Sequence, residues 1–321
     1  MHKMINILAN DGISKIGEEK LINAGFNVIT TKVAQDQLSK VINEKNISVL
    51  LVRSATKVNK DIIDSCPKLK IVGRGGVGLD NIDVKYAEKK ELKVFNTPSA
   101  SSSSVAELVF AHLFCMVRFL YDSNRKMPLE GESKFKDLKK SYSKGKELSG
   151  KTLGIIGFGR IGQEVAKRGI ALGMKIIVHD KIIKTKKIEL NFFDGKKINF
   201  EINTSPLNDV LKKSDFITLH VPKIGDKAII SEKEISIMKD GCGIVNSARG
   251  GIVDENALIS ALKNDKIKYA GLDVFENEPN PSISLLMQDN ISLTPHIGAA
   301  TLEAQDRIGE ELAEKIITFF N

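Results

Sequence analysis

Three cysteines in 321 residues are too few and too scattered for a disulfide framework or a metal cluster. Cys66, Cys115 and Cys242 are an odd number, lie far apart and form no CxxC pair. Free thiols of this kind are typical of a reducing compartment, and no metal site is expected. The N-terminus also lacks the apolar core and the small-residue cleavage site of a signal peptide. We therefore expect a cytoplasmic protein without a metal.

Long apolar runs are absent as well. The most apolar one, residues 105–120, is shorter than the roughly 20 residues that span a membrane, and it carries Glu107, His112 and Arg118. Polybasic tails and basic patches interleaved with aromatic residues are also lacking, although the net charge is +8. A lysine-rich solvated surface is therefore favoured over a nucleic-acid interface. We expect neither a membrane nor a nucleic acid as a partner, whereas a positive field favours phosphorylated small molecules.

Short strand-like runs alternate with helical patterns along the whole chain. The first series, up to about residue 97, reads INILAN, NVIT, ISVLLVRS, LKIVGRG and LKVFNT. The second series, after residue 150, reads TLGIIG, KIIVHD, DFITLHV, CGIVNSA, YAGLDVF and NISLTPH. Such alternation predicts an α/β fold with two doubly wound parallel-sheet domains, one of the Rossmann type and one flavodoxin-like. Between them we expect a long apolar helix from about residue 102 and a lysine-rich loop over residues 131–147. A terminal helix follows the second sheet, and it is expected to pack on the first domain.

Two segments fit the glycine pattern of a dinucleotide-binding turn, GRGGVG (73–78) and GFGRIG (157–162). Such a turn needs a strand before it, a helix after it and an acidic residue about 20 positions later. The second segment meets each condition, because the next strand ends at Asp180, whereas LDNID interrupts any helix after the first segment. We therefore place the cofactor at Gly157, Gly159 and Gly162. Asp180 should repel the 2′-phosphate of NADP, so that NAD is the expected cofactor.

The other glycine turn, residues 73–78, lies at the end of a predicted strand, where backbone N–H groups can cradle an anion. Arg74 lies within it, and Arg53 ends the preceding predicted strand. The carboxyl ends of neighbouring parallel strands face the same crevice. Two arginines beside a glycine turn suit a carboxylate or a phosphate, although two surface arginines beside a plain turn would produce the same pattern.

Three polar residues follow successive predicted strands of the second series: Arg249 in NSARGGIV, Glu278 in LDVFENEP and His296 in LTPHIG. An arginine in this position can bind a substrate carboxylate through two hydrogen bonds. A histidine can take the hydroxyl proton during hydride transfer, and a carboxylate on its other nitrogen would favour the imidazolium that forms. Taken singly, Glu278 and His296 could be ordinary loop residues, so their joint occurrence with Arg249 indicates a catalytic set.

The motifs RSATKV, GRGGVGLDNID, GKTLGIIGFGRIG, NSARGGIVDENAL, GLDVFENEP and TPHIGAAT occur in this order over nearly the whole chain. Together they resemble the D-isomer-specific 2-hydroxyacid dehydrogenase family, and the first two are similar to the branch that acts on D-3-phosphoglycerate. The resemblance implies NAD-dependent oxidation of D-3-phosphoglycerate to 3-phosphohydroxypyruvate, the first step of serine biosynthesis. It implies His296 as the base, Glu278 as its partner and Arg249 as the carboxylate ligand.

The same resemblance implies a discontinuous substrate-binding domain, residues 1–101 with 298–321, and an NAD-binding Rossmann domain, residues 102–297. In such enzymes the long helix after residue 102 forms a homodimer interface. Besides the three glycines, the implied cofactor contacts are Arg160, Ile161, Asp180, His220, Val221, Pro222, Ala248, Asp273 and Gly298. The implied substrate contacts are Arg53, Ser54, Arg74 and Gly76, together with Arg249 and His296.

The sequence departs from the family pattern in several places, among them VPKIGDKA, which replaces the usual threonine-containing loop along the cofactor. It ends directly after its last helix, where longer relatives carry regulatory domains, so we expect no feedback inhibition by serine through such a domain. Before ELSGKTLG, where relatives often have a tryptophan and an arginine, it has Leu138 and Lys139 or Lys140. A lysine there can reach a phosphate site only as a point charge. Residues 181–205 are longer than usual, which predicts an added hairpin beside the adenosine, and their lysines weaken the case against NADP.

Two alternatives stay open. Another member of the same family would act on an unphosphorylated acid, as a glyoxylate or hydroxypyruvate reductase or a lactate dehydrogenase does. Arg53 together with Arg74 argues for the phosphorylated acid, because Arg249 alone suffices for a carboxylate. A protein of another class, an NAD-sensing partner-binding protein like the corepressors built on this scaffold, would keep the same cofactor site. The physiological direction of the reaction is also open.

Overall fold

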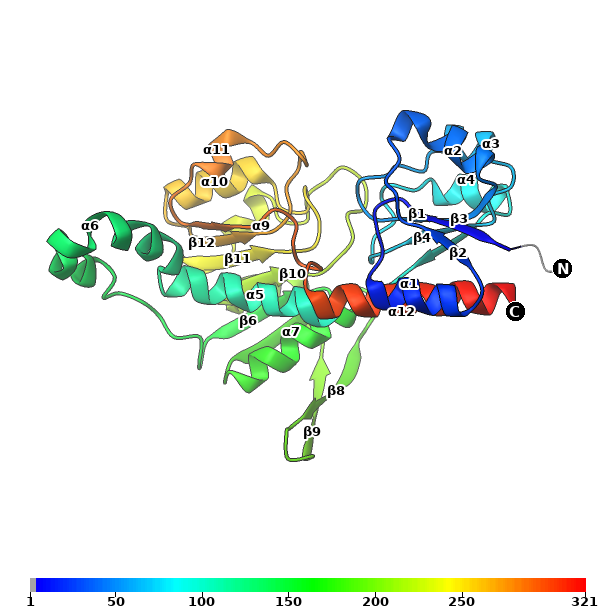
Figure 1. Cartoon of the computed structure of the whole chain (residues 1–321). Coiled ribbons are helices and arrows are strands. Elements are labelled where there is room, and N and C mark those ends of the chain that lie inside the picture. The colour runs from blue at the N-terminus through cyan, green and yellow to red at the C-terminus, as the bar shows by residue number, and fades with distance from the viewer. Residues whose placement is uncertain (1–3) are drawn as a thin grey trace. The chain divides into compact units, whose positions relative to one another are not determined.

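Two sheets of parallel strands organise the computed structural model, which describes residues 4–321 (Figure 1). The chain divides into a first unit, Met1–Ser104 with Ala299–Asn321, and a second unit, Val105–Gly298. The boundaries expected from the sequence fall at residues 101/102 and 297/298. Strands and helices alternate in both units as the sequence pattern predicts, so the α/β fold class with parallel sheets is confirmed.

The first unit holds a five-stranded sheet in the order β2-β1-β3-β4-β5, the strand order of flavodoxin-like folds. Its strands are β1 (Asn6–Ala9), β2 (Asn27–Ile29), β3 (Ile47–Val52), β4 (Ile71–Arg74) and β5 (Lys93–Asn96). Its helices are α1 (Lys15–Asn23), α2 (Leu38–Glu44), α3 (Lys60–Ser65), α4 (Val84–Lys89) and α12 (Leu302–Phe320), with a short 3₁₀ turn at Gln35–Gln37. The terminal helix α12 lies beside α1 (Figure 1), as expected. Glycines allow this approach, because a Cβ on Gly17 would lie 2.7 Å from the Cα of Gly309.

The second unit holds a six-stranded sheet in the order β13-β12-β11-β10-β6-β7. Its strands are β6 (Thr152–Ile156), β7 (Lys175–His179), β10 (Phe216–Leu219), β11 (Cys242–Asn246), β12 (Ile267–Leu272) and β13 (Ile291–Leu293). Its helices are α5 (Ser102–Val117), which begins in the first unit, α6 (Leu120–Ser141), α7 (Arg160–Ala171), α8 (Leu207–Lys213), α9 (Glu232–Ser236), α10 (Glu255–Lys263) and α11 (Ile283–Leu286). The strand order reverses between β6 and β10, and ligands of doubly wound sheets bind at the carboxyl ends of the strands at such a point.

The core of the second unit lies on both faces of this sheet. Side chains of a strand alternate between the faces, so Leu153 and Ile155 of β6 pack with α5 and α7, whereas Ile156 packs with α8 to α10. Both faces are therefore apolar, as expected for parallel strands covered by helices. Polar groups are left mainly at the strand ends, which is where the candidate site forms.

Two segments around this sheet test finer expectations. Residues 181–205 form the expected hairpin, in which β8 (Thr185–Asn191) pairs antiparallel with β9 (Lys197–Asn203). The expected lysine-rich loop over 131–147 is wrong for its first part, because α6 continues to Ser141. Pro128 and Gly131 resemble helix breakers, but the surrounding leucine, glutamate and lysine residues are good helix formers, and the break is reduced to a kink at Lys134.

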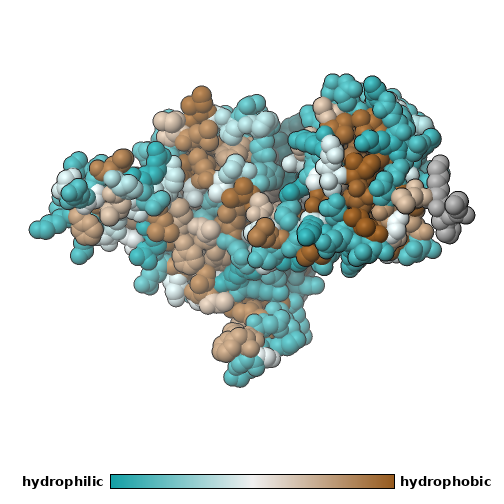
Figure 2. All heavy atoms as spheres, in the orientation of Figure 1, coloured by the Kyte–Doolittle hydropathy of each residue, from teal (hydrophilic) through white to brown (hydrophobic). Residues whose placement is uncertain are grey.

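The surface of each unit mixes hydrophilic and apolar residues (Figure 2). Apolar residues are visible at the projecting hairpin, where Phe192 and Phe193 are exposed. Within residues 4–321 no single helix is long and apolar enough to cross a membrane, and only the bent pair of α5 and α6 meets that test jointly.

Candidate active site

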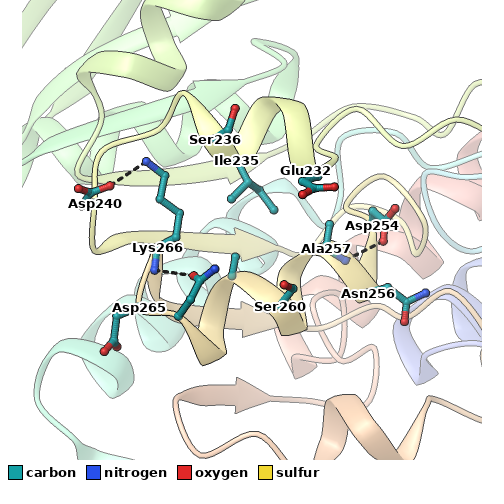
Figure 3. Close-up of a pocket in the computed structure, with 12 residues that line it drawn as sticks. Glu232, Ile235, Ser236, Asp240, Asp254, Asn256, Ala257, Ser260, Asp265 and Lys266 are labelled. Atoms are coloured by element: carbon teal, nitrogen blue, oxygen red, sulfur yellow. Dashed lines mark hydrogen bonds and ion pairs between the residues drawn. The ribbon is translucent and has the colours of Figure 1, made fainter.

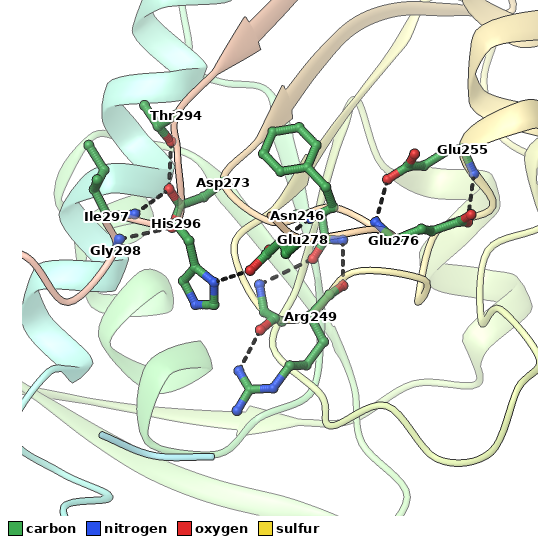
Figure 4. A network of polar contacts seen from close by, with 12 residues as sticks. Asn246, Arg249, Glu255, Asp273, Glu276, Glu278, Thr294, His296, Ile297 and Gly298 are labelled. Carbon is green, nitrogen blue, oxygen red and sulfur yellow. Dashed lines mark hydrogen bonds and ion pairs between the residues drawn. The ribbon is translucent and has the colours of Figure 1, made fainter. Parts of the chain in front are cut away.

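The three polar residues that follow successive strands come together at one edge of the second sheet (Figure 4). Arg249 follows β11, Glu278 follows β12 and His296 follows β13, and these strands are neighbours in the sheet. Parallel strands place their carboxyl ends at the same edge, so side chains far apart in the sequence become neighbours. The structure therefore joins the residues that the sequence singled out as a catalytic set.

His296 and Glu278 are in direct contact. The Nδ1 atom of His296 lies 2.8 Å from Oε2 of Glu278, while Oε1 of the same carboxylate accepts the N–H of Phe275 at 3.0 Å. The two side chains are 46% and 36% exposed, so the pair is open to solvent. A carboxylate that accepts the Nδ1 proton of a histidine leaves Nε2 as the nitrogen that can take a proton from a substrate.

Arg249 lies on a loop that is held against the loop of Glu278. Asn246 donates to the backbone carbonyl of Arg249 at 2.9 Å, and an Nη1 atom of Arg249 donates to the carbonyl of Ala248 at 2.7 Å. A Cβ on the next residue, Gly250, would collide with the backbone carbonyl of Phe275. The glycine therefore permits a close approach of the two loops that carry the catalytic candidates.

A reciprocal pair of glutamates adds a second tie between these loops. Glu255, the first residue of α10, accepts the N–H of Glu276 at 2.7 Å, and Glu276 accepts the N–H of Glu255 at 3.2 Å (Figure 4). Burial raises the pKa of Glu255, the hydrogen bond from Glu276 N–H opposes this, and the charges of Glu276 and Asp254 raise it further. This tie fixes the segment just before Glu278, and no pattern in the sequence predicts it.

Asp273 holds the segment that carries His296. Its carboxylate accepts the Thr294 hydroxyl at 2.6 Å and the N–H groups of Ile297 and Gly298 at 2.7 and 2.8 Å (Figure 4). The carboxylate is almost fully buried. Both Asp273 and Gly298 were expected as cofactor contacts; in the structure they bind each other beside the candidate base.

The glycine turn after β6 has the backbone geometry that a pyrophosphate needs. Gly157 has φ +97°, and a Cβ there would collide with the backbone carbonyl of His220. A Cβ on Gly162, within α7, would collide with the carbonyl of Gly157. At Gly159, the residue before α7, no atom lies within 4 Å of the Cβ position. The space over Gly159 leads to the free N–H groups at the start of α7, where Arg160 and Ile161 lie.

Asp180 directly follows β7 and is bonded to the glycine turn. Its carboxylate accepts the N–H of Phe158 at 2.7 Å and those of Ile182 and Ile183 at 2.8 and 2.9 Å. Partial burial acts to raise the pKa of Asp180, but these three hydrogen bonds outweigh it and hold the pKa below its usual value. The group is therefore a carboxylate, and it repels a 2′-phosphate placed beside it.

Two buried polar atoms belong to residues that follow neighbouring strands of the sheet. Leu219 of β10 is paired with Asn246 of β11, so the residues that follow, His220 and Ser247, are close. Within the described residues, the Nδ1 atom of His220 and the Oγ atom of Ser247 are buried and have no hydrogen-bond partner. Burial lowers the pKa of His220 to about 3, so its ring is neutral. A buried polar atom without a partner calls for an explanation, and a bound cofactor would supply one for these two; His220 was expected here and Ser247 was missed.

These observations fit a dinucleotide. The open space over Gly159, the start of α7 and the carboxylate of Asp180 suit the pyrophosphate and a ribose. The unpartnered atoms of His220 and Ser247 suit polar groups farther along the cofactor. The remaining expected contacts lie on the same strand ends: Val221 and Pro222 follow β10, and Ala248 precedes Arg249.

The second glycine turn lies in the first unit, at the ends of β3 and β4. Val52 is paired with Arg74, so Arg53 and Arg74 stand at neighbouring strand ends. Asn81 joins them, since it accepts from Nε of Arg74 at 3.0 Å and donates to the carbonyl of Arg53 at 2.8 Å. Gly76 has φ +154°, and a Cβ there would lie 2.6 Å from Nη1 of Arg74. Ser54 follows Arg53 in the same loop, and Asn81 is a part of this site that sequence reasoning missed.

A surface groove of about 1010 Å³ lies elsewhere in the second unit, between α9 and α10 (Figure 3). None of the residues that line it is a candidate for catalysis or cofactor binding. Its polar side chains have structural partners: Asp254 accepts the N–H of Ala257 and so caps α10, and Lys266 bonds Asp240. In the described part of the chain no group of three or more histidine, cysteine or acidic side chains could hold a metal ion.

A doubly wound parallel sheet with a glycine turn, an arginine and a carboxylate–histidine pair at its strand ends is the architecture of an NAD-dependent dehydrogenase of hydroxy acids. Residues 110–298 match the family described as D-isomer specific 2-hydroxyacid dehydrogenase, NAD binding domain. The chain belongs to this family.

Relatives that are named for different substrates are similar in sequence to this chain. A hydroxypyruvate reductase of Thermotoga maritima is 46% identical over 312 residues, which cover 96% of this chain and 95% of that one. A D-3-phosphoglycerate dehydrogenase of Methanocaldococcus jannaschii is 42% identical over 314 residues, which cover 98% of this chain but 57% of the relative. Among solved structures, a glyoxylate reductase from Paecilomyes thermophila has a TM-score of 0.81 at 27% identity and covers 98% of this chain and 95% of its own.

Proposed function

We propose that this chain oxidises D-3-phosphoglycerate at C2 to 3-phosphohydroxypyruvate with NAD. The observation that carries the choice of substrate is the pair Arg53 and Arg74 at neighbouring strand ends, bridged by Asn81. One arginine, Arg249, suffices for the carboxylate of any 2-hydroxy acid. Two further guanidinium groups beside a glycine turn are suited to the phosphate, which an unphosphorylated acid lacks.

In this proposal His296 is the base. Its Nε2 atom takes the proton of the C2 hydroxyl while the C2–H bond breaks and the carbon–oxygen double bond forms. Within residues 4–321 no side chain or backbone group forms a hydrogen bond with this nitrogen, and Glu278 on Nδ1 stabilises the imidazolium that results. NAD, when bound, supplies the acceptor for the hydride that leaves C2. In the reverse direction the same imidazolium returns the proton to the carbonyl oxygen.

Arg249 has two tasks in this proposal. Its guanidinium holds the substrate carboxylate through paired hydrogen bonds, and it polarises the adjacent oxygen as charge develops there. Gly157, Gly159 and Gly162, with Arg160 and Ile161, hold the pyrophosphate, and Asp180 selects NAD over NADP. His220, Val221, Pro222, Ala248, Asp273 and Gly298 line the rest of the cofactor.

A second candidate is reduction of hydroxypyruvate or glyoxylate. The relative that favours it is the hydroxypyruvate reductase of Thermotoga maritima, which this chain matches over nearly the whole length of both proteins. The same His296, Glu278 and Arg249 would serve that reaction. Arg53 and Arg74 would then contribute little to turnover, and this difference separates the two candidates.

The deciding experiment compares substrates in both directions. NAD reduction is followed with D-3-phosphoglycerate, D-glycerate and D-lactate, and NADH oxidation with hydroxypyruvate and glyoxylate. We expect the highest kcat/KM with D-3-phosphoglycerate, reduced about a hundredfold in Arg53→Ala or Arg74→Ala, because loss of a charged hydrogen bond costs about 2–3 kcal/mol.

The control is Lys85→Ala, which removes an exposed positive charge of α4 in the same unit and should leave every rate unchanged. Equal or higher kcat/KM with the unphosphorylated acids, unaffected by Arg53→Ala, would reject the phosphorylated substrate in favour of the second candidate. NAD binding without turnover of any acid would instead favour an NAD-sensing binding protein.

We also propose a homodimer formed through α5 and α6. Large apolar side chains are exposed there: Phe114, Leu120, Tyr121, Met127, Leu129 and Phe135. Leu129 is 82% exposed, and several exposed apolar side chains on one pair of helices are typical of an interaction surface. Sedimentation should give a mass of two chains, and Leu129→Lys should shift it toward one. A single-chain mass for the unaltered protein would reject the dimer.

A further inference from the structure

His112 is a buried histidine that the proposed reaction does not use. It lies on α5 and is 2% exposed, packed against β12 and β13. Gly271 of β12 leaves room for it, because a Cβ there would lie 2.8 Å from the Cβ of His112. A buried imidazole in a tightly packed place has a fixed orientation, and its two nitrogens therefore have defined partners.

Both partners of His112 are hydroxyl groups near the end of β13. Nδ1 lies 2.8 Å from Oγ of Ser292, and Nε2 lies 3.1 Å from Oγ1 of Thr294. The hydroxyl of Thr294 has a single proton, which it donates to Oδ1 of Asp273 at 2.6 Å. The contact with His112 therefore needs a proton on the ring, and His112 must donate from Nε2 to Thr294.

The protonation state agrees with this direction. Burial lowers the pKa of His112, and the charge of Asp273 only partly opposes it, so the ring is neutral and carries one proton. That proton is on Nε2, and Nδ1 accepts from Ser292. The chain of donors then runs one way, from His112 to Thr294 and from Thr294 to Asp273.

This series of hydrogen bonds ends at the segment that carries the candidate base. Asp273 accepts the N–H groups of Ile297 and Gly298, the two residues after His296. His296 itself has φ +54°, the left-handed region that a residue with a side chain seldom adopts, and its N–H bonds the carbonyl of Thr294. Such a conformation persists only where its surroundings hold it.

We propose that His112 is a positioning residue for His296, acting through Thr294 and Asp273. This proposal rests on the proposed role of His296 as the base. His112 touches neither substrate nor cofactor in this proposal. It fixes the Thr294 hydroxyl, which orients the Asp273 carboxylate, which in turn holds the backbone on the C-terminal side of His296. Loss of the Nε2 donor would let the imidazole move relative to Glu278, and a displacement of about 1 Å can cost about a hundredfold in rate.

The test compares three substitutions in the intact chain. His112→Leu removes both ring nitrogens, His112→Gln keeps an N–H near the position of Nε2, and Ser292→Ala removes only the partner of Nδ1. We expect His112→Leu to lower kcat by tenfold to a hundredfold, with KM for the acid and the dissociation constant of NADH within about threefold. His112→Gln should recover kcat to within about threefold of the unaltered enzyme, and Ser292→Ala should keep it.

Thr294→Val supplies the second arm and replaces His112→Leu if that variant fails to fold. It should lower kcat as His112→Leu does. The double variant of His112→Leu with Thr294→Val should be no slower than either single variant, because the two residues act through one series of hydrogen bonds. Multiplied effects in the double variant would overturn the proposal. So would a normal kcat in His112→Leu accompanied only by a lower melting temperature.

Amide hydrogen exchange separates this proposal from the proposed function. In the protein without substrate, exchange at Ile297 and Gly298 should be faster in His112→Leu and Thr294→Val and unchanged in Ser292→Ala. This result requires no turnover, so it holds even if the chain oxidises none of the acids and the proposed function fails. Unchanged exchange in His112→Leu and Thr294→Val would overturn the positioning role while leaving the proposed reaction intact.

Discussion

The carboxylate of Glu278 serves two donors at once, the Nδ1 atom of His296 at 2.8 Å and the N–H of Phe275 at 3.0 Å. Each oxygen has its own partner, and both partners present hydrogen to it. A carboxylate suits this arrangement because both of its oxygens accept and neither donates. The contact therefore fixes the tautomer of His296 as well as the orientation of its ring.

Glu278→Gln should consequently reduce turnover by more than the loss of a single contact suggests. An amide has only one oxygen, so either Phe275 N–H or His296 Nδ1 would face an NH₂ group. If His296 faces it, the ring accepts at Nδ1, carries its proton on Nε2 and can no longer act as a base. We expect kcat to fall by about a hundredfold or more, within the range known for general bases, with NADH affinity unchanged. Steady-state kinetics and NADH titration measure both quantities.

The control for this substitution is Glu276→Gln. This carboxylate also lies in the loop after β12, where one of its oxygens accepts the N–H of Glu255, and an amide oxygen can do the same. Its kcat should stay within a few fold of the unaltered enzyme. An equal fall in kcat in the two variants would mean that disturbance of the loop, and not loss of the charge beside His296, lowers turnover.

Much of this site follows from the sequence because parallel sheets gather strand ends. Arg249, Glu278 and His296 each come directly after or shortly after an apolar run, and once those runs are strands in one sheet the residues must meet at one edge. The glycine turn at residues 157–162 and Asp180 could also be predicted from the sequence. The helix α7 and the strand β7 set the spacing between the turn and Asp180.

What could not be predicted depends on side-chain packing across long sequence separations. His112 and Thr294 are 182 residues apart, and no local pattern relates them. Ser247 stands out only because its hydroxyl is buried without a partner, which is a property of the folded unit. The continuation of α6 to Ser141 was missed for a different reason: the expectation of a loop rested on the lysine-rich composition of residues 131–147, and lysine is also a good helix former.

The two glycines at the start of α7 should separate cofactor binding from folding. At Gly159 the Cβ position is empty and φ is −68°, so Gly159→Ala fits the protein without cofactor. It should keep the melting temperature within about 2 °C yet weaken NADH binding by about tenfold or more, because the methyl group would occupy the pyrophosphate space. Gly162→Ala would press its methyl against the carbonyl of Gly157, and both stability and NADH binding should fall. Thermal melts and NADH titrations test the pair, and an unaltered NADH affinity in Gly159→Ala would place the cofactor elsewhere.

Replacing Asp180 should change the choice between the two nicotinamide cofactors. The carboxylate is ionised, and a unit charge within a few ångströms of a 2′-phosphate costs more than about 1.4 kcal/mol at the dielectric of a protein surface. Asp180→Asn should therefore lower the ratio of kcat/KM for NAD to kcat/KM for NADP by at least about tenfold. It should also destabilise the fold by about 1–2 kcal/mol, because an amide leaves one of the N–H groups of Phe158, Ile182 and Ile183 facing a donor. Asp194→Asn, in the exposed hairpin turn, is the control; an unchanged ratio in Asp180→Asn would assign NAD selection to other residues.

His220 should make the protein without cofactor less stable in mild acid. Burial lowers the pKa of this histidine from 6.5 to about 3 in the folded protein. Between these two values the unfolded chain binds a proton that the folded protein does not, so the free energy of unfolding falls as the pH falls below 6.5. From pH 7 to pH 5 the loss from this one group is about 2 kcal/mol, at about 1.4 kcal/mol for each pH unit once the unfolded histidine is protonated. His220→Asn removes the titration, so its unfolding free energy should depend less on pH by that amount. Guanidinium unfolding of both proteins at pH 7 and pH 5 measures the difference. A pH dependence identical in the His220→Asn variant and the unaltered protein would mean that His220 takes up its proton without unfolding.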